Sequence, residues 1–154
     1  MDVEEVMVGE VISIRPGATI KDAVDLMNHH DIGCLVVADE GGVEGIITER
    51  DVLRRVISES RRPERTKVSD VMSKPLMVGG PTMYVEDAAK LMFKKGIKKL
   101  PILKNGGVIG IVTLSDIARI VSVEPQVAKV VEELKKSGWL PSRRMKRIVD
   151  FYIA

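Results

Sequence analysis

Residues 45–51 read GIITERD, and residues 110–116 read GIVTLSD. The two heptads share a glycine, an isoleucine, a threonine and an aspartate, and they lie 65 positions apart. Sliding the chain over itself by 65 positions aligns residues 3–56 with residues 68–121 without a gap, and 19 of the 54 pairs are identical. Self-similarity at a fixed period indicates a tandem duplication. The chain is therefore expected to hold two copies of one structural unit.

Both copies carry the same order of local patterns. Apolar residues at i, i+3, i+4 and i+7 predict an amphipathic helix that starts at Ile20 and, one period later, at Val85. A short apolar run, a Gly-Gly turn and a second strand follow each helix. In the second copy Asn105 precedes the two glycines, and this Asn-Gly pair predicts a hairpin. The strands are expected at residues 34–38, 43–48, 100–103 and 108–113. A further helix begins near the heptad aspartate, so each copy is predicted as strand, helix, strand, strand, helix.

These patterns predict an α+β fold. A unit of about 60 residues buries its surface poorly alone, so the two copies are expected to pack sheet to sheet about a pseudo-twofold axis. The charged stretch SESRRPERTK has no apolar periodicity and is the expected connector. The predicted boundaries are 1–57 for the first repeat, 58–67 for the linker, 68–122 for the second repeat and 123–154 for a C-terminal helical extension.

Composition excludes several classes of protein. The 154 residues are 45% hydrophobic and 30% charged, which suits a packed core with a solvated surface. Cys34 is the single cysteine, so neither a disulfide framework nor a cysteine-based zinc site is expected. The acidic opening and the lack of a long apolar run predict a cytoplasmic protein without a membrane span. No catalytic triad, general-base pair or metal cluster is apparent, so an enzyme is not expected.

The heptads suit a nucleotide. In Gly-x-x-Thr-x-x-Asp the threonine ends a strand and the aspartate opens a helix. A carboxylate there can accept the two hydroxyls of a ribose, and the threonine hydroxyl can reach a phosphate. The same pairs, Thr48 with Asp51 and Thr113 with Asp116, are also ordinary helix caps. Capping does not require the glycine that both heptads keep, and both interpretations stay open.

At this point the chain resembles a pair of CBS domains, a module also called a Bateman module. The resemblance rests on VMVGEVISIRPGATIKDAVDLM, VMSKPLMVGGPTMYVEDAAKLM, GIKKLPIL and the two heptads, and it covers residues 3–121. It implies two βαββα repeats and clefts that bind an adenosyl ligand: AMP, ADP, ATP or S-adenosylmethionine. It also implies a homodimer, as a disc of four repeats, and sensing rather than catalysis.

The resemblance also implies which residues hold the ligand. Asp51 and Asp116 would each hold a ribose, with Thr48 and Thr113 near the phosphate end. The residues implied for phosphate or ribose are Arg50 and Ser115, those for phosphate charge are Lys98 and Lys99, and those for the adenine are Val11, Ile12, Ile32 and Ile97. The two lysines could equally be solvated charges on an edge strand.

The C-terminal extension lies outside the resemblance. Residues 126–136 read as a helix with one apolar side, and a second helix is expected from Ser142. Four cations, Arg143, Arg144, Lys146 and Arg147, crowd its first turns, where the helix dipole disfavours positive charge. They are either solvated charges on a tail docked against its own disc or the dimer mate, or a surface for an acidic partner, a phosphate or nucleic acid.

The sequence as a whole predicts a stand-alone, cytoplasmic, homodimeric sensor. An adenine nucleotide would favour one arrangement of the two repeats and so act on an effector protein. Two alternatives remain. In the first, the clefts are empty, the chain is a scaffolding module, and the Thr-Asp pairs are only caps. In the second, the chain regulates nucleic acid or a protein through the basic C-terminal helix.

Overall fold

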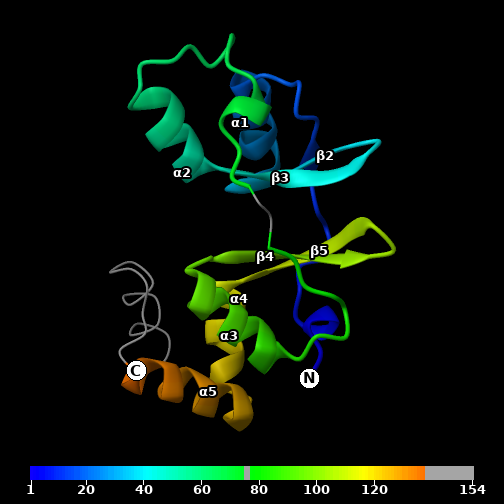
Figure 1. Cartoon of the computed structure of the whole chain (residues 1–154), viewed down its shortest axis with the longest axis vertical. Helices are drawn as coiled ribbons and strands as arrows, with labels where there is room; N and C mark the ends of the chain where they lie inside the picture. Colours follow the sequence, from blue (N-terminus) through cyan, green and yellow to red (C-terminus); the bar gives the residue numbers. More distant parts are fainter. Residues whose placement is uncertain (75–76, 138–154) are drawn as a thin grey trace. The chain divides into compact units, whose positions relative to one another are not determined.

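The computed structural model describes residues 1–74 and 77–137, which fall into two compact units (Figure 1). We name each unit after the heptad aspartate that it contains. The Asp51 unit spans Val11–Met77. The Asp116 unit combines Met1–Glu10 with Val78–Ala154. The class of the fold is α+β, as the sequence predicts.

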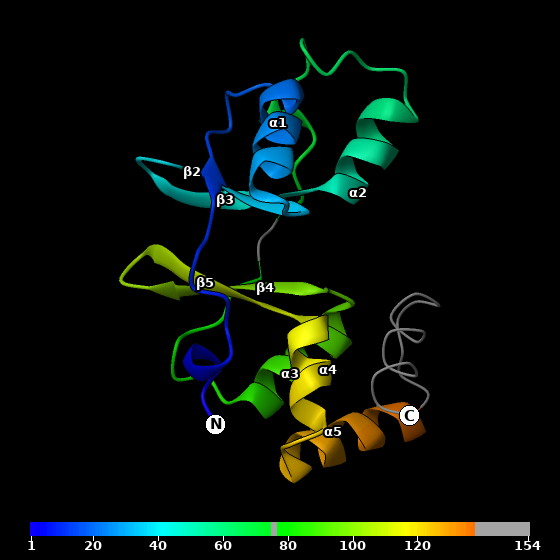
Figure 2. The same ribbon diagram turned by 180° about the vertical axis from the view of Figure 1, so that it is seen from behind.

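The Asp51 unit is built on a three-stranded sheet with the order β1-β2-β3. Strand β1 runs parallel to β2, and β2 runs antiparallel to β3. Its elements in chain order are β1 (Ser13–Ile14), α1 (Ile20–His30), β2 (Cys34–Asp39), β3 (Gly42–Thr48), α2 (Glu49–Val52), a π-helical turn η2 (Leu53–Ile57) and a 3-10 turn η3 (Val68–Asp70). Helix α1 covers one face of the hairpin (Figure 2).

Local sequence explains where α1 begins and ends. The Thr19 hydroxyl accepts the backbone N–H of Asp22, and the Asp22 carboxylate accepts the N–H of Thr19, which is a reciprocal capping box. The helix ends at Asp31, whose φ of 52° is left-handed. Ile20, Ala23 and Met27 are buried at the predicted helical spacing. The amphipathic pattern therefore placed the core face of α1 correctly.

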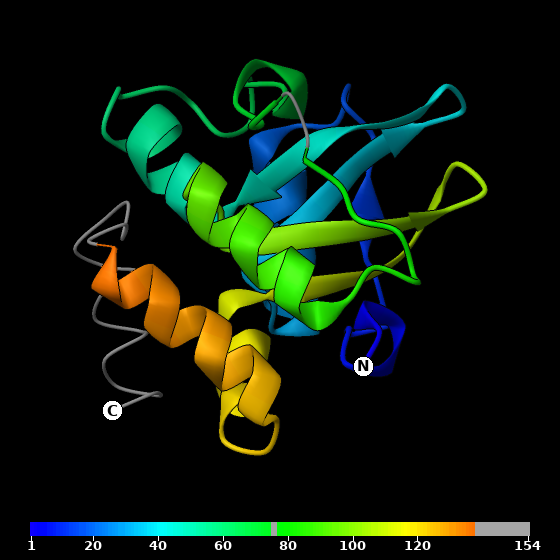
Figure 3. The same ribbon diagram turned by 60° about the horizontal axis from the view of Figure 1, so that its bottom comes forward.

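The Asp116 unit repeats this plan around a two-stranded sheet, β4-β5. Its elements are a 3-10 turn η1 (Val3–Glu5), α3 (Val85–Lys95), β4 (Lys99–Lys104), β5 (Gly107–Thr113), α4 (Leu114–Val121) and α5 (Pro125–Lys136). Helix α5, the first predicted helix of the C-terminal extension, lies against α3 and α4 (Figure 3). It buries Val127 and Val131, two residues of the predicted apolar side.

The first strand of the second repeat is reduced to a single bridge, which differs from the expected pattern. Gly79 donates its N–H to the carbonyl of Pro101 at 2.9 Å and accepts the N–H of Leu103 at 2.9 Å. The residues around it are Gly79, Gly80 and Pro81, which have low strand propensity and, at proline, no N–H to donate. The pairing therefore stops after one residue.

The two hairpins turn in different ways. Asn105 and Gly106 have φ values of 52° and 80°, as a type I′ turn requires, and Lys104 pairs with Gly107 across them. The Asn-Gly hairpin predicted from the sequence is confirmed. In the first repeat the turn residue Gly41 instead donates its N–H to the Asp39 carboxylate at 2.8 Å.

The start of each repeat lies in the unit of the other repeat. Residues 6–8, from the first sequence copy, meet β5 through a single bridge at Val8, and residues 71–73, from the second copy, meet β3 through a single bridge at Ser73. We call these two stretches the crossing segments. Ser73 and Ile46 exchange N–H···O bonds of 2.8 and 3.2 Å, and Val8 and Ile111 exchange bonds of 3.0 and 3.1 Å. Each sheet therefore depends on a segment that the sequence assigns to the other copy.

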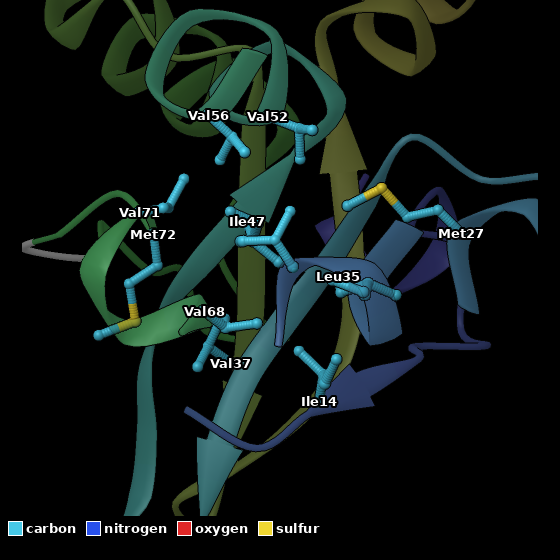
Figure 4. Packing of buried hydrophobic residues seen from close by; sticks show 12 residues of the cluster. Ile14, Met27, Leu35, Val37, Ile47, Val52, Val56, Val68, Val71 and Met72 are labelled. Atoms are coloured by element: carbon cyan, nitrogen blue, oxygen red, sulfur yellow. The ribbon is translucent and has the colours of Figure 1, made fainter. Parts of the chain in front are cut away.

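This crossing explains the heptad glycine. A Cβ atom on Gly45 would lie 2.7 Å from the carbonyl oxygen of Ser73 and 3.1 Å from the sulfur of Met72. Val71 and Met72 enter the hydrophobic core of the Asp51 unit beside Ile47 (Figure 4). The glycine is needed because backbone passes directly over the strand, independently of any ligand.

Replacing Gly45 with alanine is expected to destabilise the protein. The new methyl group must push the backbone of residue 73 away, so Gly45→Ala should lower the free energy of unfolding by about 1–3 kcal/mol. Gly17 lies in the same unit with open space around it, so Gly17→Ala should leave stability unchanged or raise it by about 0.4–1 kcal/mol. Urea denaturation of the three proteins measures both. Equal loss in the two variants would contradict the close-approach explanation.

Candidate functional site

The carboxylate of Asp51 is held by two segments of its unit. Its Oδ2 accepts the backbone N–H of Thr48 at 3.0 Å and the Thr48 hydroxyl at 3.0 Å. Its Oδ1 accepts the hydroxyl of Ser73, in the crossing segment, at 3.1 Å. The Nε of Arg55 lies 4.0 Å from the same oxygen. The residue is only 9% exposed, so this acid is buried and accepts three hydrogen bonds.

Asp116 repeats the first half of this arrangement and changes the second. Its Oδ2 accepts the N–H of Thr113 at 2.8 Å and the Thr113 hydroxyl at 2.7 Å. Its Oδ1 accepts from Nη2 of Arg119, one turn further along α4. Asp116 is 5% exposed. One carboxylate therefore has a neutral hydroxyl from the crossing segment as its third partner, and the other has a cation from its own helix.

The threonine completes a capping box in both units. The Thr48 and Thr113 hydroxyls accept the N–H of Asp51 and Asp116, at 3.2 and 3.1 Å. Each Thr hydroxyl also donates to the carboxylate that it caps. The capping interpretation of the heptads is thereby confirmed as local structure. A ribose role for the same carboxylates stays a prediction.

The acceptor sites of each carboxylate are nearly filled. A carboxylate offers about four lone-pair positions. Three are used at Asp51, by the N–H and hydroxyl of Thr48 and by the hydroxyl of Ser73. Three are likewise used at Asp116. A ribose that donates both hydroxyls would therefore have to displace one existing donor at either site.

In the Asp116 unit the predicted phosphate residues lie next to the heptad. Lys99 pairs with Thr113 across the hairpin, and the carbonyl of Lys98 accepts the N–H of Leu114 at 2.9 Å. Ser115 follows directly in α4 and is half-buried, as are the two lysines. The backbone thus brings two stretches of sequence together at one end of the hairpin.

The Asp51 unit has a different charge at the corresponding positions. Gly33 stands where the second repeat has Lys98, and its carbonyl accepts the N–H of Glu49 at 3.0 Å. A Cβ atom on Gly33 would lie 2.8 Å from a carboxylate oxygen of Glu49. The place equivalent to a lysine is thus filled by an acidic side chain. Arg50 is exposed and is the cation that the sequence predicts here.

The four predicted adenine contacts are half-buried residues that come shortly before a strand in the sequence. The carbonyl of Ile12, just before the start of β1, accepts the N–H of Val36 at 3.1 Å. Ile12 and Ile32 pack partly against the core of the Asp51 unit. Val11 and Ile97 are also half-buried. Part of the apolar surface of these residues is thus already covered by their own units.

Three carboxylate partners were not among the predicted residues. Arg119 is three residues from Asp116, so helical spacing could have indicated it. Arg55 is four residues from Asp51 and also donates to the carbonyls of Val71 and Met72, at 2.9 and 3.3 Å. Ser73 is 22 residues from Asp51. Nothing in the sequence indicates it, because the aligned residue in the first copy is Val8.

A shallow groove of about 520 Å³ runs along α1, away from these carboxylates. It is lined by Ile14, Ala18, Asp22, Asp25, Leu26 and His29. None of these is a predicted ligand residue. Asp22 is used in the capping box of α1, and Asp25 pairs with Lys21. The groove contains none of the residues that the sequence predicts for the ligand, so it is not the candidate site.

The remaining predictions concern metals, membranes and the basic tail. No group of three acidic, histidine or cysteine side chains is clustered for metal binding within residues 1–74 and 77–137. Over the same residues no helix has both the length and the apolar character needed to cross a bilayer. The four cations of the predicted last helix, Arg143, Arg144, Lys146 and Arg147, lie outside the described residues.

The two segments that contain these carboxylates match a described family of domains. The model of the CBS domain matches residues 3–58 and 68–123. A CBS domain-containing protein, YhcV of Bacillus subtilis, is 38% identical over 116 residues, which are 75% of this chain and 82% of that protein. An inosine-5'-monophosphate dehydrogenase of Methanocaldococcus jannaschii is 35% identical over 118 residues, but these are only 23% of that enzyme.

Solved structures agree with the fold. The hexameric CBS-CP12 protein from bloom-forming cyanobacteria superposes with a TM-score of 0.71 at 26% sequence identity. The superposition covers 99% of this chain and 92% of that chain.

Removing one threonine hydroxyl is expected to weaken the helix start. Thr113→Val keeps the branched shape but leaves the N–H of Asp116 without its acceptor, so the free energy of unfolding should fall by about 0.5–2 kcal/mol. Thr82 is an exposed turn residue, and Thr82→Val should change stability by less than about 0.5 kcal/mol. Urea denaturation of both variants measures the difference. A Thr113→Val protein as stable as the parent would remove the capping role.

Proposed function

The chain belongs to the CBS-domain family, and we propose that it binds an adenine nucleotide through its heptad carboxylates and passes that signal to a partner protein. CBS pairs are generally regulatory modules, and stand-alone proteins built from them are typically regulatory. The nucleotide (AMP, ADP or ATP, with S-adenosylmethionine as a further adenosyl candidate) and the effector are the specific parts of the proposal.

One observation carries the proposal. At the end of the β4–β5 hairpin, the backbone brings Lys98, Lys99 and Ser115 beside the Thr113–Asp116 pair. A carboxylate that accepts hydroxyls and neighbouring cations that attract phosphate are the two groups that recognise a ribose phosphate. The resemblance to CBS pairs assigns these groups the same roles.

The two units would favour different numbers of phosphates. The Asp116 unit offers two lysines, whereas the Asp51 unit has Glu49 against Gly33 and a single predicted cation, Arg50. A carboxylate near the phosphates opposes their negative charge. A ligand with more phosphates is therefore expected at the Asp116 unit, and an uncharged or singly phosphorylated one at the Asp51 unit.

A scaffolding module without a ligand is the second candidate, and the burial of the carboxylates favours it. Both are at least nine-tenths buried and already serve as capping-box acceptors. A protein that used the heptads only to start its helices would need nothing more. The two candidates differ in what a change from aspartate to asparagine should do.

Thermal unfolding with AMP, ADP, ATP and S-adenosylmethionine in turn tests the proposal. A ligand at 100 times its dissociation constant should stabilise the protein by about 2.7 kcal/mol. An asparagine oxygen can still accept the capping N–H, so the double variant Asp51→Asn/Asp116→Asn should fold but lose most of this ligand-dependent gain. Asp31→Asn, at an exposed helix end, should keep it.

Two results would favour the scaffold instead. One is the absence of stabilisation by all four compounds. The other is an equal gain in the parent and the double Asn variant, since binding would then not depend on the carboxylates. A ligand-dependent gain that is present in the parent and in the Asp31→Asn control, but lost in the double Asn variant, supports the sensor.

We also propose that the chain self-associates through the helix that follows the first heptad. Leu53 and Ile57 are four residues apart, on one face of the helical turn, and are 61% and 57% exposed. The equivalent residues of the second repeat are Ala118 and Ser122, and Ala118 is 2% exposed in a helix that contacts α5. The structural relative from cyanobacteria is described as hexameric, which supports association of copies.

Polar substitution of this pair is expected to change the oligomeric state. Leu53→Ser/Ile57→Ser should shift the protein from dimer to monomer in light scattering coupled to gel filtration, because the apolar contact is lost. Val123 is 71% exposed at a different place, and Val123→Ser should leave the mass unchanged. A double variant with the same mass as the parent would move the interface elsewhere.

A further inference from the structure

The two crossing segments are held to their sheets by different means. Residues 6–8 rest on β5 by the two backbone bonds between Val8 and Ile111 and by packing. Residues 71–73 have the equivalent pair of backbone bonds to Ile46 and, in addition, side-chain bonds. The additional bonds come from the residues around Asp51. Only one crossing segment is thus tied to a candidate ligand carboxylate.

Two side chains make this tie. The hydroxyl of Ser73 donates to Oδ1 of Asp51 at 3.1 Å. Arg55 donates to the carbonyls of Val71 and Met72 and lies 4.0 Å from the same carboxylate oxygen. In the Asp116 unit the corresponding positions hold Val8 and Ile120, which have no such groups.

We propose that a nucleotide at Asp51 loosens the crossing segment 71–73 by competing with Ser73 for the carboxylate, so that the first repeat signals along the chain to the second. The inference rests on the proposed function, since it requires a ribose at this aspartate. The inference adds that Ser73 is the residue through which binding at Asp51 would affect the rest of the chain. The crossing segment is a few residues from Val78, where the Asp116 unit resumes.

Counting acceptors shows why Ser73 is the donor that leaves. Three of about four lone-pair positions on the Asp51 carboxylate are in use, and a ribose diol brings two hydroxyl donors. Thr48 contributes two of the three existing bonds as part of its capping box, and releasing its N–H would leave a backbone donor unpaired. The half-buried hydroxyl of Ser73 can turn to water instead.

The same count at Asp116 has a different consequence. The donor that would leave there is Arg119, whose side chain is 69% exposed and can return to water. No bond to the crossing segment 6–8 is broken, because Val8 has none with Asp116. Ligand at the second repeat would therefore leave its crossing segment unchanged, and the two binding events would be distinguishable.

Residue-resolved hydrogen exchange tests this directly. The N–H of Ser73 donates to Ile46, and the N–H of Val8 donates to Ile111, so the two amides are a matched pair. Saturating AMP should speed exchange at Ser73 by roughly fivefold, the effect of one lost hydrogen bond on local opening, with no such increase at Val8. The compound 2′-deoxy-AMP lacks the 2′-hydroxyl and so offers one hydroxyl donor in place of two, and it should have less effect.

Variants of residue 73 separate this inference from the proposed function. Ser73→Val introduces the residue that the other crossing segment carries, so the Ser73→Val protein should exchange faster without ligand, still bind AMP in calorimetry, and show no further AMP response. Ser73→Thr keeps the hydroxyl and should restore the response. The control Val8→Ser should leave the AMP response at residue 73 as in the parent.

Three outcomes are decisive. AMP that binds the parent without altering exchange at Ser73 overturns the inference and leaves the proposed function intact. If AMP speeds exchange at residue 73 in Ser73→Val as much as in the parent, the inference is likewise overturned and the proposed function is left intact. Failure of AMP to bind the parent in calorimetry overturns both for this nucleotide.

Discussion

Core packing, sheet pairing and the candidate site of the Asp51 unit all depend on the close approach of one backbone to another at the heptad glycine. The crossing segment lies so near β3 that a methyl group on Gly45 would meet the carbonyl oxygen of Ser73 at 2.7 Å. This contact brings Val71 and Met72 into the core. It also places a serine hydroxyl on the buried carboxylate of Asp51. Packing, sheet pairing and the candidate site thus share one geometric requirement.

The duplication leaves the two carboxylates chemically unequal. A hydrogen bond to a carboxylate is charge-assisted whether its donor is neutral or cationic, but only a cationic donor also offsets the negative charge of the acid. Asp51 accepts from the neutral hydroxyl of Ser73 and has Arg55 at 4.0 Å, while Asp116 accepts directly from the guanidinium of Arg119. The surroundings differ too, since Glu49 lies against Gly33 where the second repeat has Lys98. The same heptad therefore provides two sites with different electrostatic preferences within one chain.

The sequence was sufficient for whatever depends on local pattern or on internal repetition. Helical spacing predicted the buried face of α1, the Asn-Gly pair predicted the turn of the second hairpin, and the repeat predicted the family. It failed where distant segments meet. The contact of Ser73 with Asp51 spans 22 residues and has no counterpart in the aligned copy. The heptad glycine suggested a ligand, whereas a passing backbone explains it.

The reciprocal placement of the crossing segments is domain swapping within a single chain. Residues 1–10 complete the unit that contains the second hairpin, and residues 68–77 complete the unit that contains the first. A chain with one copy alone could reproduce this only by exchanging its first segment with another molecule, which is a low-cost route to a dimer. Fusing two copies makes the exchange intramolecular. It also frees the two heptads to diverge, because a mutation in one is no longer repeated in its partner.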